Sequence, residues 1–201
     1  MNPNSADERH VLRMQHKKAV IDEHIEAAQI RRGVIVVNTG NGKGKSSAAF
    51  GVVARALGHG LKVAVIQFVK SRSDTGEEGF FRLCENVEWH VMGQGFTWET
   101  QDKERDAIAA REAWKQAQRY LADPGIGLLV LDELTYAFKY GWLELDAVLT
   151  DLRSRPLMQH VVITGRAAPP ALIEAADTVS DVSMIKHAYK EGVAAMPGME
   201  F

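Results

Sequence analysis

The chain has little of what marks a secreted or membrane protein. Its 201 residues include a single cysteine, Cys84, so no intramolecular disulfide can form. The longest uninterrupted apolar run covers only 126–131, whereas a membrane-spanning helix needs roughly 20 such residues. The first ten residues, MNPNSADERH, contain acids and no apolar stretch, unlike a signal peptide. We therefore expect a cytoplasmic protein with no membrane partner.

Neither sign of charge predominates. The 24 Lys and Arg residues against 26 Asp and Glu give a net charge of -2, so the overall field gives no reason to expect nucleic acid as a partner. The composition, 46% hydrophobic and 25% charged, excludes a chain that is disordered throughout. The length predicts one domain that can bury its own core.

Motifs of several other protein classes are missing. The sequence has no [NT]KxD motif that reads guanine and no kinase-type HRD or DFG set, which argues against a GTPase and a protein kinase. The histidines show no zinc spacing. His187 follows Lys186 near the expected ligand edge, and we interpret it as structural.

Short apolar runs alternate with helical segments along the chain. The expected strands are 34–37, 63–69, 87–92, 128–131 and 161–164, with 178–185 as a candidate sixth. The expected helices are 48–57, 80–83, 102–121, 133–153 (interrupted near Gly141) and 169–176. This alternation predicts an α/β fold, a mostly parallel sheet with helices on both faces. Ligands of such sheets bind beyond the carboxyl ends of the strands. One edge should therefore be lined by the loops 39–46, 70–79, 93–101, 132–135 and 165–170.

The ends of the chain differ from its centre. Residues 7–30 predict a helix whose apolar residues spread around most of the helical wheel. The segment 1–32 is therefore either a loosely docked helix or a cap that closes over a ligand. The main domain is expected at 33–190, and 191–201 forms a tail without a strong signal.

A glycine-rich segment between the first strand and the next helix carries the strongest functional signal. Its backbone N–H groups and the helix N-terminus favour an anion. The Lys45 ammonium can reach a phosphate oxygen, and the Ser46 hydroxyl can bind Mg²⁺. The expected ATP-binding residues of this phosphate loop are Thr39, Gly40, Asn41, Gly42, Lys43, Gly44, Lys45, Ser46 and Ser47.

The phosphate loop departs from the common pattern G-x-x-x-x-G-K-[ST]. Thr39 occupies the position of the first glycine, and the loop has an extra glycine, Gly42, and an extra cation, Lys43. Since moving a glycine moves the turn, the phosphate cradle should differ from that of ordinary ATPases. The GxGxxG dinucleotide motif also fails, because Lys45 stands at its third glycine.

An acidic pair follows the strand 128–131. Asp132 or Glu133 could hold Mg²⁺ beside the phosphate loop, although apolar runs that end in two acids are common. In a hydrolase, Glu133 would be the base that activates water. These residues indicate a Mg-nucleotide enzyme and leave its reaction open.

The order of the motifs along the chain supports a family assignment. They are TGNGKGKSSAAFG (39–51), ARALGHG (54–60), QFVK (67–70), GFTWETQ (95–101), LLVLDELTY (128–136), ITGR (163–166) and DTVS (177–180). From about residue 33 to 187 the chain resembles the ATP:corrinoid adenosyltransferases, the cob(I)yrinic acid a,c-diamide adenosyltransferase family. This resemblance implies a RecA-like phosphate-loop domain. It also makes the Thr39 variant of the loop part of the family pattern.

The resemblance implies transfer of the 5′-deoxyadenosyl group of ATP to Co(I) of a reduced corrinoid (cobalamin, cobinamide or cobyrinic acid a,c-diamide), with release of triphosphate. ATP would bind in an orientation reversed from that of other phosphate-loop enzymes. The expected catalytic residues are Lys43, Lys45 and Glu133, and the expected ligands of Mg²⁺ or Mn²⁺ are Ser46, Asp132 and Glu133.

Further expectations follow from the same resemblance. Arg55 would reach a phosphate or form a structural salt bridge, and Phe96 and Trp98 would contact the corrinoid. A reducing flavoprotein and a homodimer are implied as partners.

Two other functions remain open at this point. An ATPase or small-molecule kinase would use Glu133 as base and release ADP rather than intact triphosphate. A non-catalytic ATP sensor or corrinoid chaperone would bind its ligands without turnover.

Overall fold

The computed structural model describes residues 6–69, 75–93 and 103–200, and it divides into two units, Met1–Arg31 and Arg32–Phe201. The first unit contains one helix, α1 (Ala6–Ala27), with Asp7 and Glu8 in its first turn and His24 in its last. The two acids suit the helix dipole. The apolar side chains of α1, such as Leu12 and Ile25, are exposed within their own unit.

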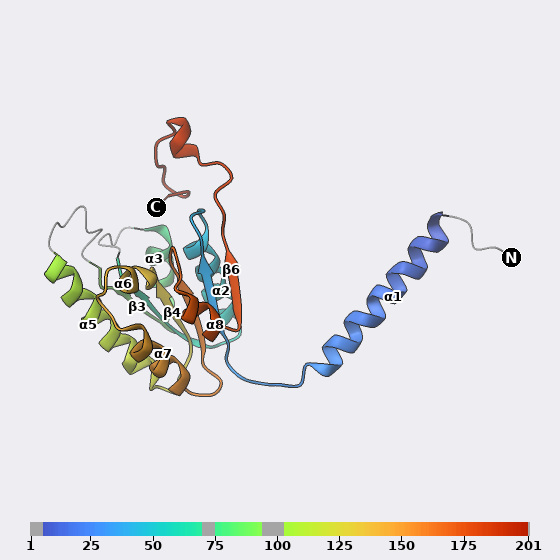
Figure 1. The fold of residues 1–201 in the computed structure, drawn as a ribbon, viewed down its shortest axis with the longest axis horizontal. Coiled ribbons are helices and arrows are strands. Elements are labelled where there is room, and N and C mark those ends of the chain that lie inside the picture. Colours follow the sequence, from blue (N-terminus) through green and yellow to red (C-terminus); the bar gives the residue numbers. More distant parts are fainter. Residues whose placement is uncertain (1–5, 70–74, 94–102, 201) are drawn as a thin grey trace. The chain divides into compact units, whose positions relative to one another are not determined.

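The second unit is built on a six-stranded sheet in the order β3-β2-β4-β5-β1-β6 (Figure 1). Every strand pair among the described residues is parallel. The predicted α/β fold is therefore confirmed. The sequence predicts a mostly parallel sheet, and the described strands form one that is parallel throughout. The strands are β1 (Ile35–Thr39), β2 (Lys62–Gln67), β3 (Val87–Val91), β4 (Ile126–Asp132), β5 (His160–Thr164) and β6 (Thr178–Asp181).

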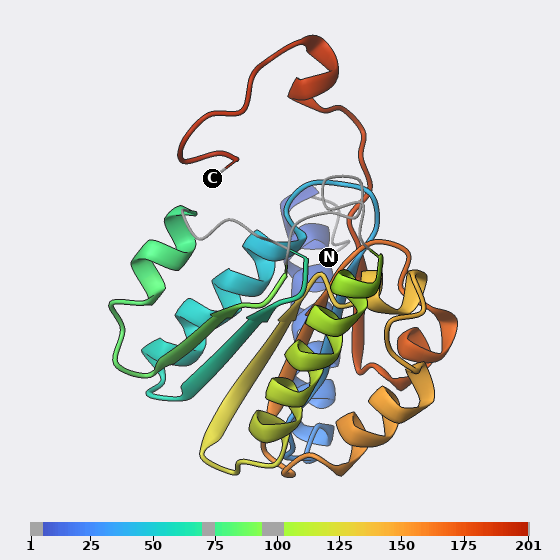
Figure 2. The same ribbon diagram turned by 90° about the vertical axis from the view of Figure 1, so that its left-hand side faces the viewer.

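Helices cover both faces of the sheet (Figure 2). One face carries α2 (Lys45–Gly58) and α3 (Gly76–Phe81). The other face carries α5 (Lys103–Leu121), α6 (Thr135–Lys139), α7 (Leu145–Ser154) and α8 (Pro170–Ala175). Each central strand is buried on both sides: in β2, Val63 and Val65 pack under α2 and α3, while Ala64 and Ile66 face the opposite core. Two-sided burial explains why these strands are continuous apolar runs.

Two details of the helices follow from sequence. The periodic face of 102–121 is confirmed, because its members Ala110, Ala113, Trp114, Ala117 and Leu121 are all buried in α5. The stretch 133–153 divides into α6 and α7 around Gly141, whose φ of 68° breaks the helix.

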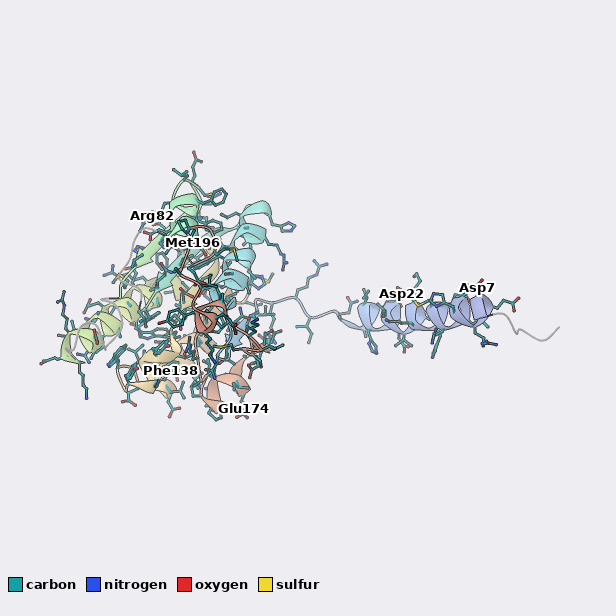
Figure 3. All side chains as sticks on the ribbon, turned by 90° about the horizontal axis from the view of Figure 1, so that it is seen from above. Asp7, Asp22, Arg82, Phe138, Glu174 and Met196 are labelled. Carbon is teal, nitrogen blue, oxygen red and sulfur yellow. The ribbon has the colours of Figure 1, made fainter. Side chains whose placement is uncertain are left out.

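The last strand is shorter than the expected 178–185. It ends at Asp181, and the chain continues beside the phosphate loop, where the Val182 N–H donates to the Thr39 carbonyl (2.8 Å) and the Val182 carbonyl accepts from the Gly42 N–H (2.6 Å). A short 3₁₀ helix, η1 (Ala188–Glu191), follows. The tail then turns back, so that Glu200 forms an ion pair with Lys43. Figures 1 and 2 show this segment beyond the carboxyl edge of the sheet, and Met196, labelled in Figure 3, belongs to it.

An ion pair next to the amino ends of β1 and β6 holds the first residues of the second unit in place. The Arg32 guanidinium donates to both carboxylate oxygens of Asp177, at 2.9 and 2.5 Å, and the Ile35 N–H donates to the same carboxylate at 2.8 Å. These hydrogen bonds, chiefly those from Arg32, lower the pKa of Asp177 from the usual 3.8 to about 2. A carboxyl group whose pKa is lower in the folded state stabilises the fold at pH values above its unfolded pKa. This contribution is lost as the pH falls through about 2.

We therefore expect Asp177→Asn to lower the free energy of unfolding at pH 7 and to flatten its decline between about pH 4 and pH 2. Urea unfolding at a series of pH values measures both effects. Glu174→Gln, on the neighbouring α8, is the control and should follow the wild-type curve. Parallel pH curves for Asp177→Asn and wild type would contradict this account of the Arg32–Asp177 pair.

Candidate functional site

The phosphate loop joins β1 to α2 through a turn that requires glycine. Gly40 has φ 98° and Gly44 has φ 114°, a left-handed conformation that other residues seldom adopt. Thr39, at the position of the usual first glycine, is buried, and its hydroxyl accepts a hydrogen bond from the Ala168 N–H at 3.1 Å. Thr39 thus ties the start of the loop to the segment that follows β5.

The extra glycine of the loop is explained by the backbone that continues from β6. A Cβ atom on Gly42 would lie 2.6 Å from the Val182 carbonyl oxygen and 2.8 Å from that of Ser183. A Cβ atom on Gly40 would lie 2.3 Å from the Asp181 Oδ1 atom. Only glycine leaves room for this close approach.

The two lysines of the loop have different surroundings. Lys45 is 6% exposed, and its Nζ donates to the Gly42 carbonyl at 2.7 Å. Burial lowers the pKa of Lys45, while the nearby Glu133 carboxylate acts in the opposite direction. Lys43 is exposed at the rim, where it pairs with Glu200.

A cavity of about 290 Å³ lies against the loop. From the loop it is lined by Asn41, Gly42, Lys43, Gly44, Lys45, Ser46 and Ser47, and from other segments by Glu77, Glu133, Tyr136, Arg166, His187, Met199 and Glu200. The structure thus gathers both lysines, the Ser46 hydroxyl and the Glu133 carboxylate around one space. Burial and the Glu133 carboxylate raise the pKa of Tyr136, which keeps this phenol neutral beside the acid.

A second cavity of about 530 Å³ adjoins the first, because Asn41 and Arg166 line both. Its other lining residues are Gly40, Asp181, Ser183, Met184 and Lys190. The sequence motifs alone do not predict Arg166 as a site residue. The available signal was its position in the loop after β5, at the edge where ligands were expected.

The acidic pair after β4 is divided between two environments. Glu133 lines the cavity and has φ 61°, a conformation that costs an ordinary residue about 1 kcal/mol. Its N–H donates to the Thr164 Oγ1 at 2.9 Å, which helps to hold this backbone. Asp132 is 0% exposed and accepts hydrogen bonds from the Gln67 Nε2 (3.0 Å) and the Thr164 Oγ1 (2.7 Å).

The remaining predicted site residues lie elsewhere. Arg55 is in the last turn of α2, ten residues beyond Lys45, which is roughly 15 Å along the helix axis. It lines a separate, mostly apolar cavity of about 370 Å³ with His59 and His160, so the structure does not bring it to the phosphate loop. Phe96 and Trp98 lie outside the described residues. His187 lines the phosphate-loop cavity, and its Nδ1 accepts from the Tyr189 N–H at 3.2 Å.

The donor set suits a divalent ion that arrives with a nucleotide. Within 6–69, 75–93 and 103–200, no three His, Cys, Asp or Glu side chains form a metal-binding group. Mg²⁺ does not need one, since one or two protein oxygens plus phosphate oxygens and water complete its shell. The Ser46 hydroxyl and the Glu133 carboxylate, on one cavity, fit this requirement.

In the described part of the chain, every helix is too short or too polar to span a bilayer.

Sequence comparison places the chain among known enzymes. Residues 31–201 match the family described as ATP:corrinoid adenosyltransferase BtuR/CobO/CobP, and residues 1–25 match the N-terminal family of cob(I)alamin adenosyltransferases. The corrinoid adenosyltransferase of Pseudomonas aeruginosa is 61% identical over 97% of both chains. Those of Escherichia coli and Salmonella typhimurium are 46% and 45% identical, over 98% of this chain and the full length of theirs.

Structural comparison supports the fold alone. The flagellar accessory protein FlaH from Methanocaldococcus jannaschii superposes with a TM-score of 0.56 at 11% identity, covering 76% of this chain and 72% of FlaH. This likeness agrees with the α/β fold and parallel sheet described above. The family match over most of the length, together with the cavity on the variant phosphate loop, shows that this chain belongs to the ATP:corrinoid adenosyltransferase family and is an enzyme of that activity.

Proposed function

We propose that the phosphate-loop cavity binds the triphosphate of ATP and stabilises it as the leaving group. The observation that carries the proposal is the meeting of Lys45, Ser46 and Glu133 on one cavity. The loop N–H groups and the N-terminus of α2 add partial positive charge to the same space. Lys43 at the rim and Arg166 between the two cavities supply further cations.

The reaction needs little acid–base chemistry from the protein. The Co(I) centre of the reduced corrinoid substrate is a strong nucleophile and attacks C5′ of ATP with its own electron pair. A cobalt–carbon bond forms, the C5′–oxygen bond breaks, and triphosphate leaves with the electrons of that bond. The negative charge that grows on the departing oxygen is what Lys45 and the loop stabilise, an effect worth about 3 kcal/mol for one well-placed donor.

Mg²⁺, for which Mn²⁺ can substitute, would be held by Ser46 and Glu133 together with the triphosphate. When bound, it supplies further electrostatic stabilisation of the leaving group. Glu133 thus serves as a ligand. The alternative, an ATPase or kinase with Glu133 as base, is not favoured by the family match.

Corrinoid binding and the reduction of its cobalt depend on residues and a partner protein outside the phosphate-loop cavity. We assign the corrinoid contact to Phe96 and Trp98, on the family pattern of the loop GFTWETQ. A reducing flavoprotein would supply electrons to the bound Co(II) corrinoid. We further propose a cytoplasmic homodimer.

A first assay tests the reaction itself. Anaerobic incubation with MgATP and chemically reduced cob(I)alamin should give a light-sensitive alkyl-cobalt spectrum and one triphosphate per corrinoid. ADP and phosphate without a spectral change would instead support the ATPase or kinase. Binding of both ligands without turnover would support a sensor or chaperone.

Trp98→Ala tests whether this residue acts in the reduction of Co(II) or in the transfer to Co(I). We propose that the Trp98 side chain, in contact with the corrinoid, favours reduction of Co(II) and does not contact ATP. The variant should therefore bind ATP as the wild type does. It should lose activity with Co(II) corrinoid and reductase at least tenfold more than with preformed Co(I). Parallel assays from the two cobalt states measure this ratio, and equal losses would rule out the proposed role of Trp98.

A further inference from the structure

A chain of buried hydrogen bonds crosses four adjacent strands at or near their carboxyl ends and finishes on Glu133, which lines the phosphate-loop cavity. The Trp89 indole N–H on β3 donates to the Gln67 Oε1 on β2 at 3.1 Å, and the Gln67 Nε2 donates to the Asp132 Oδ2 at the end of β4 at 3.0 Å. From the other side, the Thr164 hydroxyl on β5 donates to the Asp132 Oδ1 at 2.7 Å and accepts from the Glu133 N–H at 2.9 Å.

Both ends of this chain are groups that can only donate. The indole N–H of Trp89 points the oxygen of the Gln67 amide towards itself and therefore turns the amide nitrogen towards Asp132. At the other end, the Glu133 N–H occupies the Thr164 oxygen as a donor and turns the hydroxyl hydrogen towards Asp132. The central residue must therefore accept from both sides. A carboxylate does so, whereas a carboxamide offers one acceptor and one donor.

Burial separates this central acceptor from the cavity. Asp132, Gln67 and Thr164 are each 0% exposed, and Trp89 is 4% exposed. Glu133, by contrast, lines the cavity and is held in its left-handed conformation with its N–H on Thr164. The left-handed backbone of Glu133 is thus held by the chain of hydrogen bonds that ends on its N–H group.

We infer that Trp89, Gln67, Asp132 and Thr164 are positioning residues that set the backbone of Glu133, and that Asp132 serves as the shared acceptor of this chain rather than as a direct metal ligand. The inference rests on the proposed role of Glu133 in holding the metal. It assigns functional importance to three residues outside the expected site, Trp89, Gln67 and Thr164.

The first test removes only the hydroxyl between Asp132 and Glu133. Thr164→Val keeps the side-chain shape but abolishes two bonds of the chain, whereas Thr164→Ser retains both. Binding of Mn²⁺ in the presence of ATP and the absence of corrinoid, measured by electron paramagnetic resonance, reports on the metal site without turnover. We expect Thr164→Val to weaken Mn²⁺ binding at least tenfold and Thr164→Ser to bind within about threefold of wild type.

Glu133→Gln is the reference for this test. Weak Mn²⁺ binding by Glu133→Gln together with normal binding by Thr164→Val would overturn the inference and leave the proposed metal role intact. Normal binding by Glu133→Gln would overturn the metal role of Glu133 and, with it, the inference. Equal weakening by Thr164→Ser and Thr164→Val would also overturn it, since the hydroxyl would then not be the cause.

The second test uses the fixed direction of the chain. In Asp132→Asn, the new NH₂ group faces the Gln67 NH₂ group, and a flip of Gln67 would bring its NH₂ group against the Trp89 N–H. Trp89→Phe removes that terminal donor and permits the flip, while a phenyl ring can still pack against Phe81 and Phe50, whose ring centroids lie 5.9 and 5.1 Å from that of the indole.

We therefore expect Asp132→Asn to weaken Mn²⁺ binding at least tenfold. The double variant with Trp89→Phe should recover to within about threefold of Trp89→Phe alone. If Asp132 is itself a metal ligand, the double variant will remain as weak as Asp132→Asn, and the inference fails. Should Trp89→Phe prove unstable, the Thr164 pair decides the question.

Discussion

Replacing Lys45 by Ala should lower kcat/KM for adenosyl transfer by about 10³-fold, one of the two largest effects that we expect. The ammonium group is buried under the phosphate loop and already contacts the Gly42 carbonyl, so its position is set before ATP arrives. A fixed cation in a place with little water stabilises developing negative charge more strongly than a solvated one. Loss of such a donor costs about 3 to 4 kcal/mol in the transition state.

Lys43→Ala is the matched control for this prediction. Lys43 belongs to the same loop and carries the same charge, but it is exposed and paired with Glu200. We expect a loss of about tenfold, because solvent screens an exposed charge. Anaerobic assays with preformed cob(I)alamin, in which reduction is not limiting, give both values. Equal losses in the two variants would show that the net charge of the loop matters and the buried position of Lys45 does not.

Much of the fold could be predicted because its local signals agree with one another. Strands that are buried on both faces appear as apolar runs, as in 63–66 and 128–131, and helices between them force parallel pairing. The end of β6 could not be predicted. Beyond Asp181, the backbone of Val182 bonds to Thr39 at the end of β1 and to Gly42 of the phosphate loop, tertiary contacts that no periodicity in 178–185 records.

The site was predictable where chain neighbours form it and less so where distant segments meet. Residues 41–47 and Glu133 line the first cavity and Gly40 lines the second, whereas Thr39 belongs to the lining of neither. Arg55 and Arg166 show the limit of such reasoning. Arg55 follows the loop closely in sequence, but the helix carries it away from the phosphate cavity, whereas Arg166 reaches the cavity because β5 ends nearby.

The sequence indicates the buried chain of hydrogen bonds less directly than it indicates the phosphate loop. Gln67, Asp132 and Thr164 are the last residues of β2, β4 and β5, and each directly follows a run of apolar residues. Parallel register brings such ends together, because Gln67 stands opposite Asp132 between β2 and β4. A polar residue at the carboxyl end of a buried strand therefore predicts a hydrogen-bond partner on a neighbouring strand, since a buried polar group must be paired.

The second large effect concerns the extra glycine of the loop. Gly42→Ala should weaken ATP binding by at least 100-fold and lower the free energy of unfolding by about 1–3 kcal/mol. The added methyl group would lie 2.6 Å from the Val182 carbonyl oxygen and 2.8 Å from that of Ser183, and both obstacles are backbone. Either the loop or the segment after β6 must move, and the Gly42 N–H would lose its bond to Val182. Calorimetric titration with ATP and urea unfolding measure the two effects.

Gly51→Ala supplies the matched control, with the opposite sign for stability. Gly51 lies within α2, and a Cβ atom there would meet nothing within 4 Å. Alanine should therefore raise the free energy of unfolding by up to about 1 kcal/mol, as expected for a helix interior, and leave ATP binding unchanged. If Gly42→Ala binds ATP as tightly as Gly51→Ala does, the loop can move away from Val182 without harm. The variant glycine pattern would then not be explained by the close approach of the segment after β6, and the shape of the phosphate cradle would have to arise within residues 39–47 themselves.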